Sequence, residues 1–167
     1  MNSMYDMEMV RPMWEELAMA GVKPLKTPKE VDEIITRPGE TTLIVVNSVC
    51  GCAAGNARPG VSLALQHNVI PDNLGTVFAG VDGEATQRAR HHIGDFPPSS
   101  PSVALFKDGR LVYMLERKQI EKMSVQNIAH NLNMAFDKYC TMPGPSVSPE
   151  VFEEMYNISV ADARGTN

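Results

Sequence analysis

Short apolar runs alternate with segments of helical periodicity over the first two thirds of the chain. Residues 43–46 and 76–81 are apolar and rich in β-branched side chains, a pattern typical of strands buried on both faces of a sheet. Residues 53–68 carry small and aliphatic side chains at helical spacing, and Pro59 predicts a kink in that helix. A polar helix is predicted over residues 82–92. This order of elements indicates a parallel strand pair in an α/β domain.

The last third of the chain has a different pattern. Residues 103–106 and 111–115 are apolar runs on either side of Asp108 and Gly109, and Asp-Gly between such runs is a strong signal for a β-hairpin. Residues 119–139 repeat apolar side chains at helical spacing, which predicts an amphipathic helix that closes the fold. A hairpin added to a parallel strand pair makes the predicted sheet mixed.

Both ends of the chain are predicted to lie outside this core. Residues 1–10 are expected to form a flexible arm, followed by a helix from about Pro12, since proline suits a first helical turn. Thr27 is predicted to cap a second helix before the central strand. Residues 141–167 are expected to form a C-terminal extension with a loop, a short helix around residues 151–156 and a frayed tail.

Composition narrows the class of protein. With 43% hydrophobic residues, residues 1–167 suffice for a single domain with a core and are too few for two comfortable domains. The net charge of −5, with no Lys/Arg cluster, argues against nucleic-acid binding. No apolar run approaches the roughly 18 residues that cross a bilayer, and the acidic, polar start is unlike a signal peptide. We therefore expect no membrane binding and a cytoplasmic location.

The chain has three cysteines. This number is odd and small, whereas a secreted disulfide framework needs a larger, even number of cysteines. A reducing compartment fits better, and the close pair Cys50 and Cys52 is then catalytic or metal-binding. Cys140 stands alone and is expected to be a buried or partly buried cysteine at a helix end. Of eleven methionines, six lie in the first nineteen residues, where we expect gap-filling or arm positions.

Cys50 and Cys52 lie where the first buried strand runs into a helix. Unpaired N–H groups and the helix dipole favour a negative group at such a turn, and a thiolate is one. Cys50 precedes the first helical turn, so we predict that it is the nucleophile. Cys52 enters the helix, so we predict that it is less exposed, higher in pKa and the resolving thiol. Gly51 allows the tight backbone of a strained Cys-x-Cys ring, which should be more oxidising than the pair of thioredoxin at about −270 mV.

A Cys-x-Cys pair can also bind a soft metal, so a metal chaperone is a rival function. Four-coordinate zinc would need two further ligands, and the neighbouring His91 and His92 point to different faces of their helix. We therefore assign no residue to a metal site. A third possibility is an interaction domain without catalysis, for which the sequence shows no large apolar stripe left over.

The order of elements resembles a thioredoxin-like fold, and residues 100–109 (SPSVALFKDG) are similar to the proline–strand–turn segment of that fold. Residues 46–60 (VNSVCGCAAGNARPG) resemble the signature of the bacilliredoxins. The resemblance implies a central mixed sheet of four to five strands, flanked by helices and preceded by extra N-terminal helices. It also implies that Pro101 follows a cis peptide and faces the reactive sulfur.

The function that this resemblance implies is a thiol–disulfide oxidoreductase that removes bacillithiol from protein mixed disulfides. Its partners would be bacillithiolated client proteins, with bacillithiol as the thiol co-substrate and no other cofactor. The alternatives are a general protein disulfide isomerase or oxidoreductase and, as the weaker one, the metal chaperone. The catalytic residues would be Cys50, Cys52 and Pro101.

Five further residues are candidates for substrate binding: Asn47, Ser48, Gly51, Arg58 and Ser100. Arg58 is the cation nearest in sequence that could bind the malate of bacillithiol, although a solvated helix residue is an equal alternative. Asn47 and Ser48 could bond the thiolate or cap the helix.

The chain departs from ordinary thioredoxins at two positions. Ile44 replaces their buried Asp, and Val49 replaces the Trp before the active cysteine. Without that acid, we expect backbone dipoles to provide most of the stabilisation of the thiolate.

Overall fold

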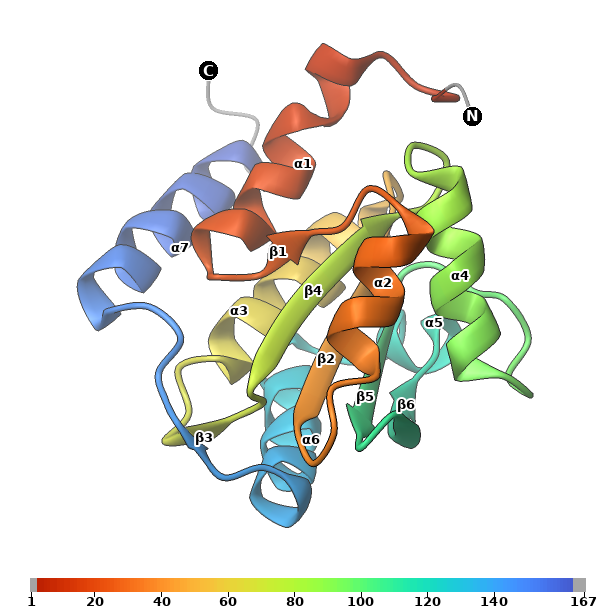
Figure 1. Cartoon of the computed structure of the whole chain (residues 1–167). Coiled ribbons are helices and arrows are strands. Elements are labelled where there is room, and N and C mark those ends of the chain that lie inside the picture. Colours follow the sequence, from red (N-terminus) through yellow and green to blue (C-terminus); the bar gives the residue numbers. More distant parts are fainter. Residues whose placement is uncertain (1–2, 164–167) are drawn as a thin grey trace.

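The computed structural model describes the backbone of residues 3–163 and the side chains of residues 3–158. Within this part of the chain, a mixed sheet of five strands forms the centre of the molecule (Figure 1). In spatial order the strands are β1 (Lys23–Pro24), β4 (Asn73–Phe78), β2 (Thr41–Asn47), β5 (Ser102–Lys107) and β6 (Arg110–Leu115). The strands β1, β4 and β2 are parallel, whereas β5 and β6 each run antiparallel to the preceding neighbour. The parallel pair, the hairpin and the mixed sheet predicted from the sequence are confirmed.

The central strand β2 is buried along its whole length, as its apolar run predicts. Successive side chains of a strand point to opposite faces, so Leu43 and Val45 enter one core cluster while Ile44 and Val46 enter the other. The β5–β6 turn has positive φ angles of 52° at Asp108 and 77° at Gly109. Positive φ at both central residues is what a tight two-residue hairpin turn needs, which explains the strength of the Asp-Gly signal.

Helices cover both faces of the sheet. Four of them are α2 (Pro28–Ile35), α3 (Arg58–Ala64), α4 (Gly83–Ile93) and α6 (Val125–Tyr139). The helices α2 and α4 pack against the Ile44 side, and α3 and α6 pack against the Leu43 side. A Cβ atom at Gly60 would lie 2.6 Å from Cγ2 of Ile128, so glycine permits the close approach of α3 to α6. The long closing helix predicted from the sequence is divided into α5 (Arg117–Ile120) and α6, because Ser124 caps a new helix by accepting a hydrogen bond from the Asn127 N–H.

The helix after the cysteine turn is not uniformly α-helical. It starts at Gly51, and a π-helical segment, η1 (Ala53–Ala57), precedes α3. Pro59 has no N–H to offer the carbonyl one turn earlier, and a wider π turn is one way in which a helix accommodates such a gap. The expected disturbance at Pro59 therefore takes the form of π-helical turns just after the two thiols.

The predicted flexible arm over residues 1–10 is wrong for its described part. Helix α1 (Met7–Met19) begins five residues before Pro12, because the Asp6 carboxylate accepts a hydrogen bond from the Glu8 N–H at 2.8 Å and caps it. Val10 is fully buried, and the Met4 N–H donates to the Gly80 carbonyl. Residues 1–2 lie outside the described residues.

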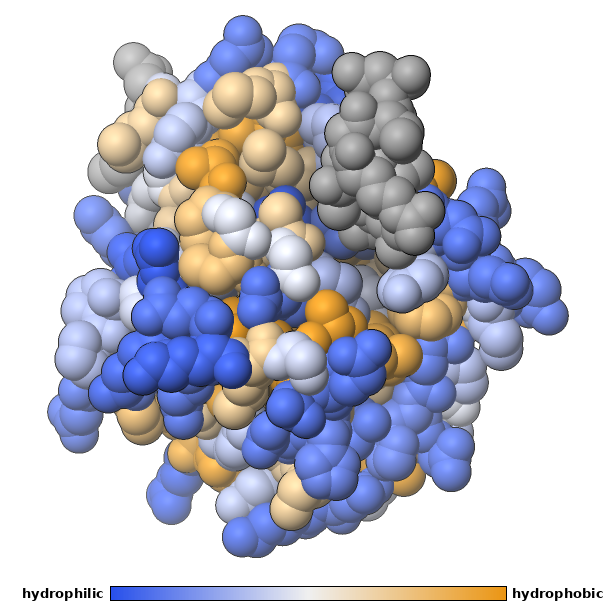
Figure 2. All heavy atoms as spheres, turned by 180° about the vertical axis from the view of Figure 1, so that it is seen from behind, coloured by the Kyte–Doolittle hydropathy of each residue, from blue (hydrophilic) through white to orange (hydrophobic). Residues whose placement is uncertain are grey.

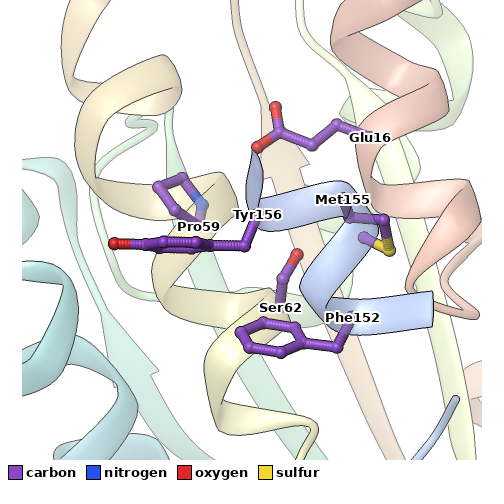
Figure 3. Close-up of a pocket in the computed structure, with 6 residues that line it drawn as sticks. All are labelled: Glu16, Pro59, Ser62, Phe152, Met155 and Tyr156. Atoms are coloured by element: carbon purple, nitrogen blue, oxygen red, sulfur yellow. The ribbon is translucent and has the colours of Figure 1, made fainter. Parts of the chain in front are cut away.

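The C-terminal extension is more structured than predicted. Strand β7 (Met142–Pro143) pairs with β3 (Val69–Ile70), and helix α7 (Pro149–Ala163) is longer than the expected 151–156. Figure 3 shows Phe152 and Tyr156 of α7 directed toward α3. The end of the predicted tail, residues 164–167, lies outside the described part. Over residues 3–163, no helix combines the length and apolarity that crossing a bilayer demands.

Candidate active site

The turn after β2 brings the two thiols together. The sulfur atoms of Cys50 and Cys52 lie 2.9 Å apart, and both residues are half-buried. The Ser48 hydroxyl donates to Cys50 Sγ at 3.1 Å and accepts from the Cys50 N–H at 3.4 Å. Gly51 is exposed, and a Cβ atom there would meet nothing within 4 Å. The pair is thus accessible, and Ser48 is within direct reach of the Cys50 sulfur.

The surroundings separate the pKa values of the two thiols. Burial raises the pKa of Cys50, but hydrogen bonds from Cys52, Ser48 and the Ala53 N–H, with the nearby charge of Arg117, outweigh it and lower the pKa overall. Burial raises the pKa of Cys52, and its hydrogen bond to Cys50 and the charge there raise it further. The pKa order is the one expected from the sequence, although the expected difference in exposure is absent.

The source of this stabilisation differs from the expectation. Ile44 is fully buried between β4 and β5 and offers no acid. Backbone dipoles were therefore expected to provide most of the stabilisation of the Cys50 thiolate. The hydrogen bonds from the side chains of Cys52 and Ser48 instead exceed that from the Ala53 backbone. Local side-chain donors therefore stabilise the Cys50 thiolate more than the backbone donor does.

Arg58 is not the free cation that the sequence analysis proposed for substrate binding. Its side chain is 4% exposed, and its Nε donates to Glu16 Oε2 at 2.8 Å. Its Nη1 donates to Asn47 Oδ1 at 3.0 Å and to the Ser48 carbonyl at 2.9 Å. The prediction is wrong because tertiary packing places α3 against the turn, where the guanidinium holds the backbone that precedes Cys50.

Asn47 is also a structural residue rather than a substrate contact. It is 1% exposed, and its Nδ2 donates to the Met13 carbonyl at 3.1 Å. Its Oδ1 accepts from the Ser48 N–H at 2.8 Å and from Arg58. Asn47 therefore joins α1 to the turn beneath the thiols, and it neither bonds the thiolate nor caps the helix that begins at Gly51.

The proline segment lies at the same end of the sheet as the thiols. The Ser100–Pro101 peptide is cis, as the thioredoxin-like resemblance implied. In the antiparallel β2–β5 register, Val46 pairs with Ser102, so the residues before Ser102 run alongside the turn that follows Asn47. Pro101 is buried and Ser100 is half-buried.

Arg117 was missed by the sequence analysis. Its Nη1 donates to the Ser100 carbonyl at 3.3 Å, and its charge lowers the pKa of both thiols, although other effects raise that of Cys52 overall. The predicted hairpin contained the signal, because β6 returns the chain to the end of the sheet at which β2 finishes. The residues just after β6, where Arg117 lies, are therefore at the same end of the sheet as the cysteine turn.

Cys140 lies far from this turn and is buried at the end of α6, as expected. Burial raises the pKa of its thiol to about 11, although a hydrogen bond with Thr41 opposes that effect. Among the residues that the structure describes, no group of three or more His, Cys, Asp or Glu side chains could hold a metal ion.

Comparisons with known proteins agree on the class of chain. A family described as Disulphide isomerase matches residues 5–140. A bacilliredoxin of Cytophaga hutchinsonii is 53% identical over 135 residues, which cover 81% of this chain and 99% of the relative. A bacilliredoxin of Staphylococcus aureus is 52% identical over 125 residues, which cover 75% of this chain and 86% of the relative.

Solved structures show a weaker likeness. Mitochondrial thioredoxin 3 of Saccharomyces cerevisiae is 16% identical and has a TM-score of 0.49, and the match covers 72% of this chain and 98% of that one. A second solved structure, of a protein described as an oxidoreductase with a thioredoxin fold, is 14% identical and also has a TM-score of 0.49. This match covers 67% of this chain and 95% of that one.

Proposed function

Because the chain belongs to the bacilliredoxin family and is a thiol–disulfide oxidoreductase, we propose that it removes bacillithiol from protein mixed disulfides in the cytoplasm. The names of the curated relatives support bacillithiol as the group that is removed. The observation that carries the proposal is the unequal thiol pair, in which Cys50 has the lowered pKa and Cys52, 2.9 Å away, has the raised one.

The first step is attack by the Cys50 thiolate on the bacillithiol sulfur of the mixed disulfide. The bond between that sulfur and the client sulfur breaks, and a disulfide forms between Cys50 and bacillithiol. The client leaves as a thiolate, which takes a proton from water, so the client is reduced. The hydrogen bond from Ser48 lowers the pKa of Cys50, which supports its role as the attacking thiol.

The second step frees Cys50 by one of two routes. In the first, Cys52 loses its proton and attacks the Cys50 sulfur, which releases bacillithiol and leaves a Cys50–Cys52 disulfide. In the second, another bacillithiol thiolate attacks the bacillithiol sulfur of the adduct, which forms bacillithiol disulfide and restores the Cys50 thiolate. The short distance between the sulfur atoms supports the first route.

Two measurements test the proposal. A test protein carrying bacillithiol on one cysteine is compared with the same protein carrying glutathione, and faster release of bacillithiol is expected. Equal rates would instead indicate a general thiol oxidoreductase. Mass spectrometry of the Cys52→Ala variant should find bacillithiol attached to Cys50, and an adduct at Cys140 alone would contradict the assignment.

Isomerisation of protein disulfides is the second candidate, and the name of the matched family favours it. The same Cys50 thiolate would attack a non-native disulfide of a client, and a client thiol would later displace it. This function is measured separately by the rate at which a protein with scrambled disulfides recovers its activity. The wild-type protein and the Cys52→Ala variant are each compared with a sample that contains neither.

A further inference from the structure

A groove runs beside the cysteine turn, and three separate parts of the chain form it. Its volume is about 660 Å³, and its lining includes Met9 and Met13 of α1, Gly51 and Ala54 of the turn, and Met155 and Ile158 of α7. Gly51 is the residue between the two reactive cysteines. The groove therefore reaches the backbone between the two cysteines, and its volume is within the range of sites that bind ligands.

The walls of this groove are apolar and partly open to solvent. Met9 is 50% exposed, Met19 is 43% exposed and Ile158 is 51% exposed. In Figure 2, apolar side chains gather in the upper half of the face, at the end of the molecule where Figure 1 shows α1. The sequence analysis expected gap-filling or arm positions for the early methionines. Met13 does pack against the core cluster that contains Val10, and Met9, Met13 and Met19 also line this groove.

The charges of the groove select among possible occupants. Glu15 and Glu16 each bring a carboxylate, and Arg58 brings one guanidinium that is already bonded to Glu16. The three charges sum to −1, so a small thiol that carries malate would be repelled. An apolar polypeptide segment with a basic residue matches both the walls and the charge.

The wall that α7 contributes packs against the rest of the domain. Met155 of α7 is 5% exposed, and α7 contacts both α1 and α3. Figure 3 shows Phe152 and Tyr156 beside Ser62 and Pro59. The family match ends at residue 140, so this wall is an addition to the part of the chain that the family shares.

We propose that this groove binds an apolar, positively charged segment of the client polypeptide, and so selects which modified cysteines reach Cys50. The proposal rests on the function proposed above, because it concerns the clients of the same thiol pair. Methionine side chains are unbranched and flexible, so they can repack against segments of different sequence. The groove would thus favour a class of client rather than one partner.

Two synthetic peptides of equal length test this selection. Each has one cysteine that carries bacillithiol, flanked in the first by Leu, Val and one Lys, and in the second by Ser and Gly. The protein should release bacillithiol from the first peptide with a kcat/KM about tenfold higher, since burial of one or two apolar side chains contributes that much. Equal values of kcat/KM would overturn the proposal.

Variants of the two walls assign the selection to the groove. Ile158→Gln and Met9→Gln, which replace an apolar side chain with a polar one and add no charge, should each lower kcat/KM for the apolar peptide by about tenfold and leave the polar peptide unchanged. Met134→Gln, on α6 and outside the groove lining, is the matched control, because Met134 is also exposed, at 59%. An equal loss with the control, or an equal loss for both peptides, would overturn the proposal.

Two further readouts distinguish client binding in the groove from the choice of thiol and from self-association. The same peptides carrying glutathione are measured in parallel. A preference for the apolar peptide with glutathione but no release of bacillithiol would refute the proposed function and still support the groove. Sedimentation of the wild-type protein and of Ile158→Gln detects self-association. A dimer that the variant dissociates would show that a second copy occupies the groove and would overturn the proposal.

Discussion

Cys50 and Cys140 lie near opposite ends of the central strand and have opposite chemistry. Cys50 follows the end of β2, is half-buried, and has a lowered pKa because hydrogen bonds and Arg117 outweigh the effect of burial. Cys140 interacts with Thr41, the first residue of β2, and burial there raises its pKa to about 11. Burial raises the pKa of both thiols, and only at Cys50 do hydrogen-bond donors and a nearby charge outweigh that effect.

This difference shows that burial alone does not determine the reactivity of a thiol. Desolvation raises the pKa at both sites, so donors and nearby charges decide which cysteine can act as a nucleophile. Substitutions that remove a donor at Cys50, or the thiol at Cys140, test this comparison directly.

The largest effect is expected from exchanging the nucleophile. Cys50→Ser should reduce the release of bacillithiol from a protein by at least about a thousandfold, because a serine hydroxyl does not attack a disulfide. Cys140→Ser is the matched control and should keep most of the activity. Comparable losses in both variants would show that the distant thiol takes part in the reaction.

Removal of the guanidinium beneath the turn should destabilise the fold. Arg58→Leu leaves Glu16, Asn47 and the Ser48 carbonyl without their buried donor, so the free energy of unfolding should fall by about 3 kcal/mol. Urea denaturation measures this loss. Arg88→Leu, which breaks a more exposed ion pair with Asp32, should cost less than about 1 kcal/mol, and equal losses would contradict the anchoring role.

Cys140 should make stability depend on pH in the alkaline range. Because its pKa is raised from an ordinary 9.0 to about 11 in the folded state, the unfolded chain loses this proton first as the pH rises. The contribution is fully present below pH about 9 and is lost between about 9 and 11, with a total on the order of 2 kcal/mol. Denaturation measured at several pH values across this range should show that the free energy of unfolding falls less steeply with pH in Cys140→Ala than in the wild type.

Ser48→Ala should slow Cys50 without disabling it. The variant lacks a donor to the thiolate, so the pKa of Cys50 should rise and alkylation at mildly acidic pH should slow by about threefold to tenfold. At strongly alkaline pH both proteins are ionised at Cys50 and should react equally. A uniform difference at every pH would point to altered access rather than to an altered pKa.

The smallest effect is expected at Arg117, which is exposed. Arg117→Gln should raise the pKa of Cys50 slightly and slow its alkylation by about twofold at low salt. Added salt should remove the difference, because it screens the charge. Lys118→Gln is the control, since only Arg117 is among the charges that act on Cys50.

The local parts of the site follow from the sequence alone. The run before Asn47, the Cys-Gly-Cys turn and the Asp-Gly hairpin were all predictable, because strand burial and turn geometry depend on neighbouring residues. The start of α1 was missed although Asp6 was present, because Pro12 suggested a later first turn.

Which distant residues serve the thiols depends on the tertiary structure. Arg58 was predicted as a free cation and is a buried anchor, while Arg117, which is 67 residues after Cys50, supplies the charge. The groove likewise needs α1, the turn and α7 together. The electrostatic and packing forces involved depend on distance in space, and the sequence pattern reports only distance along the chain.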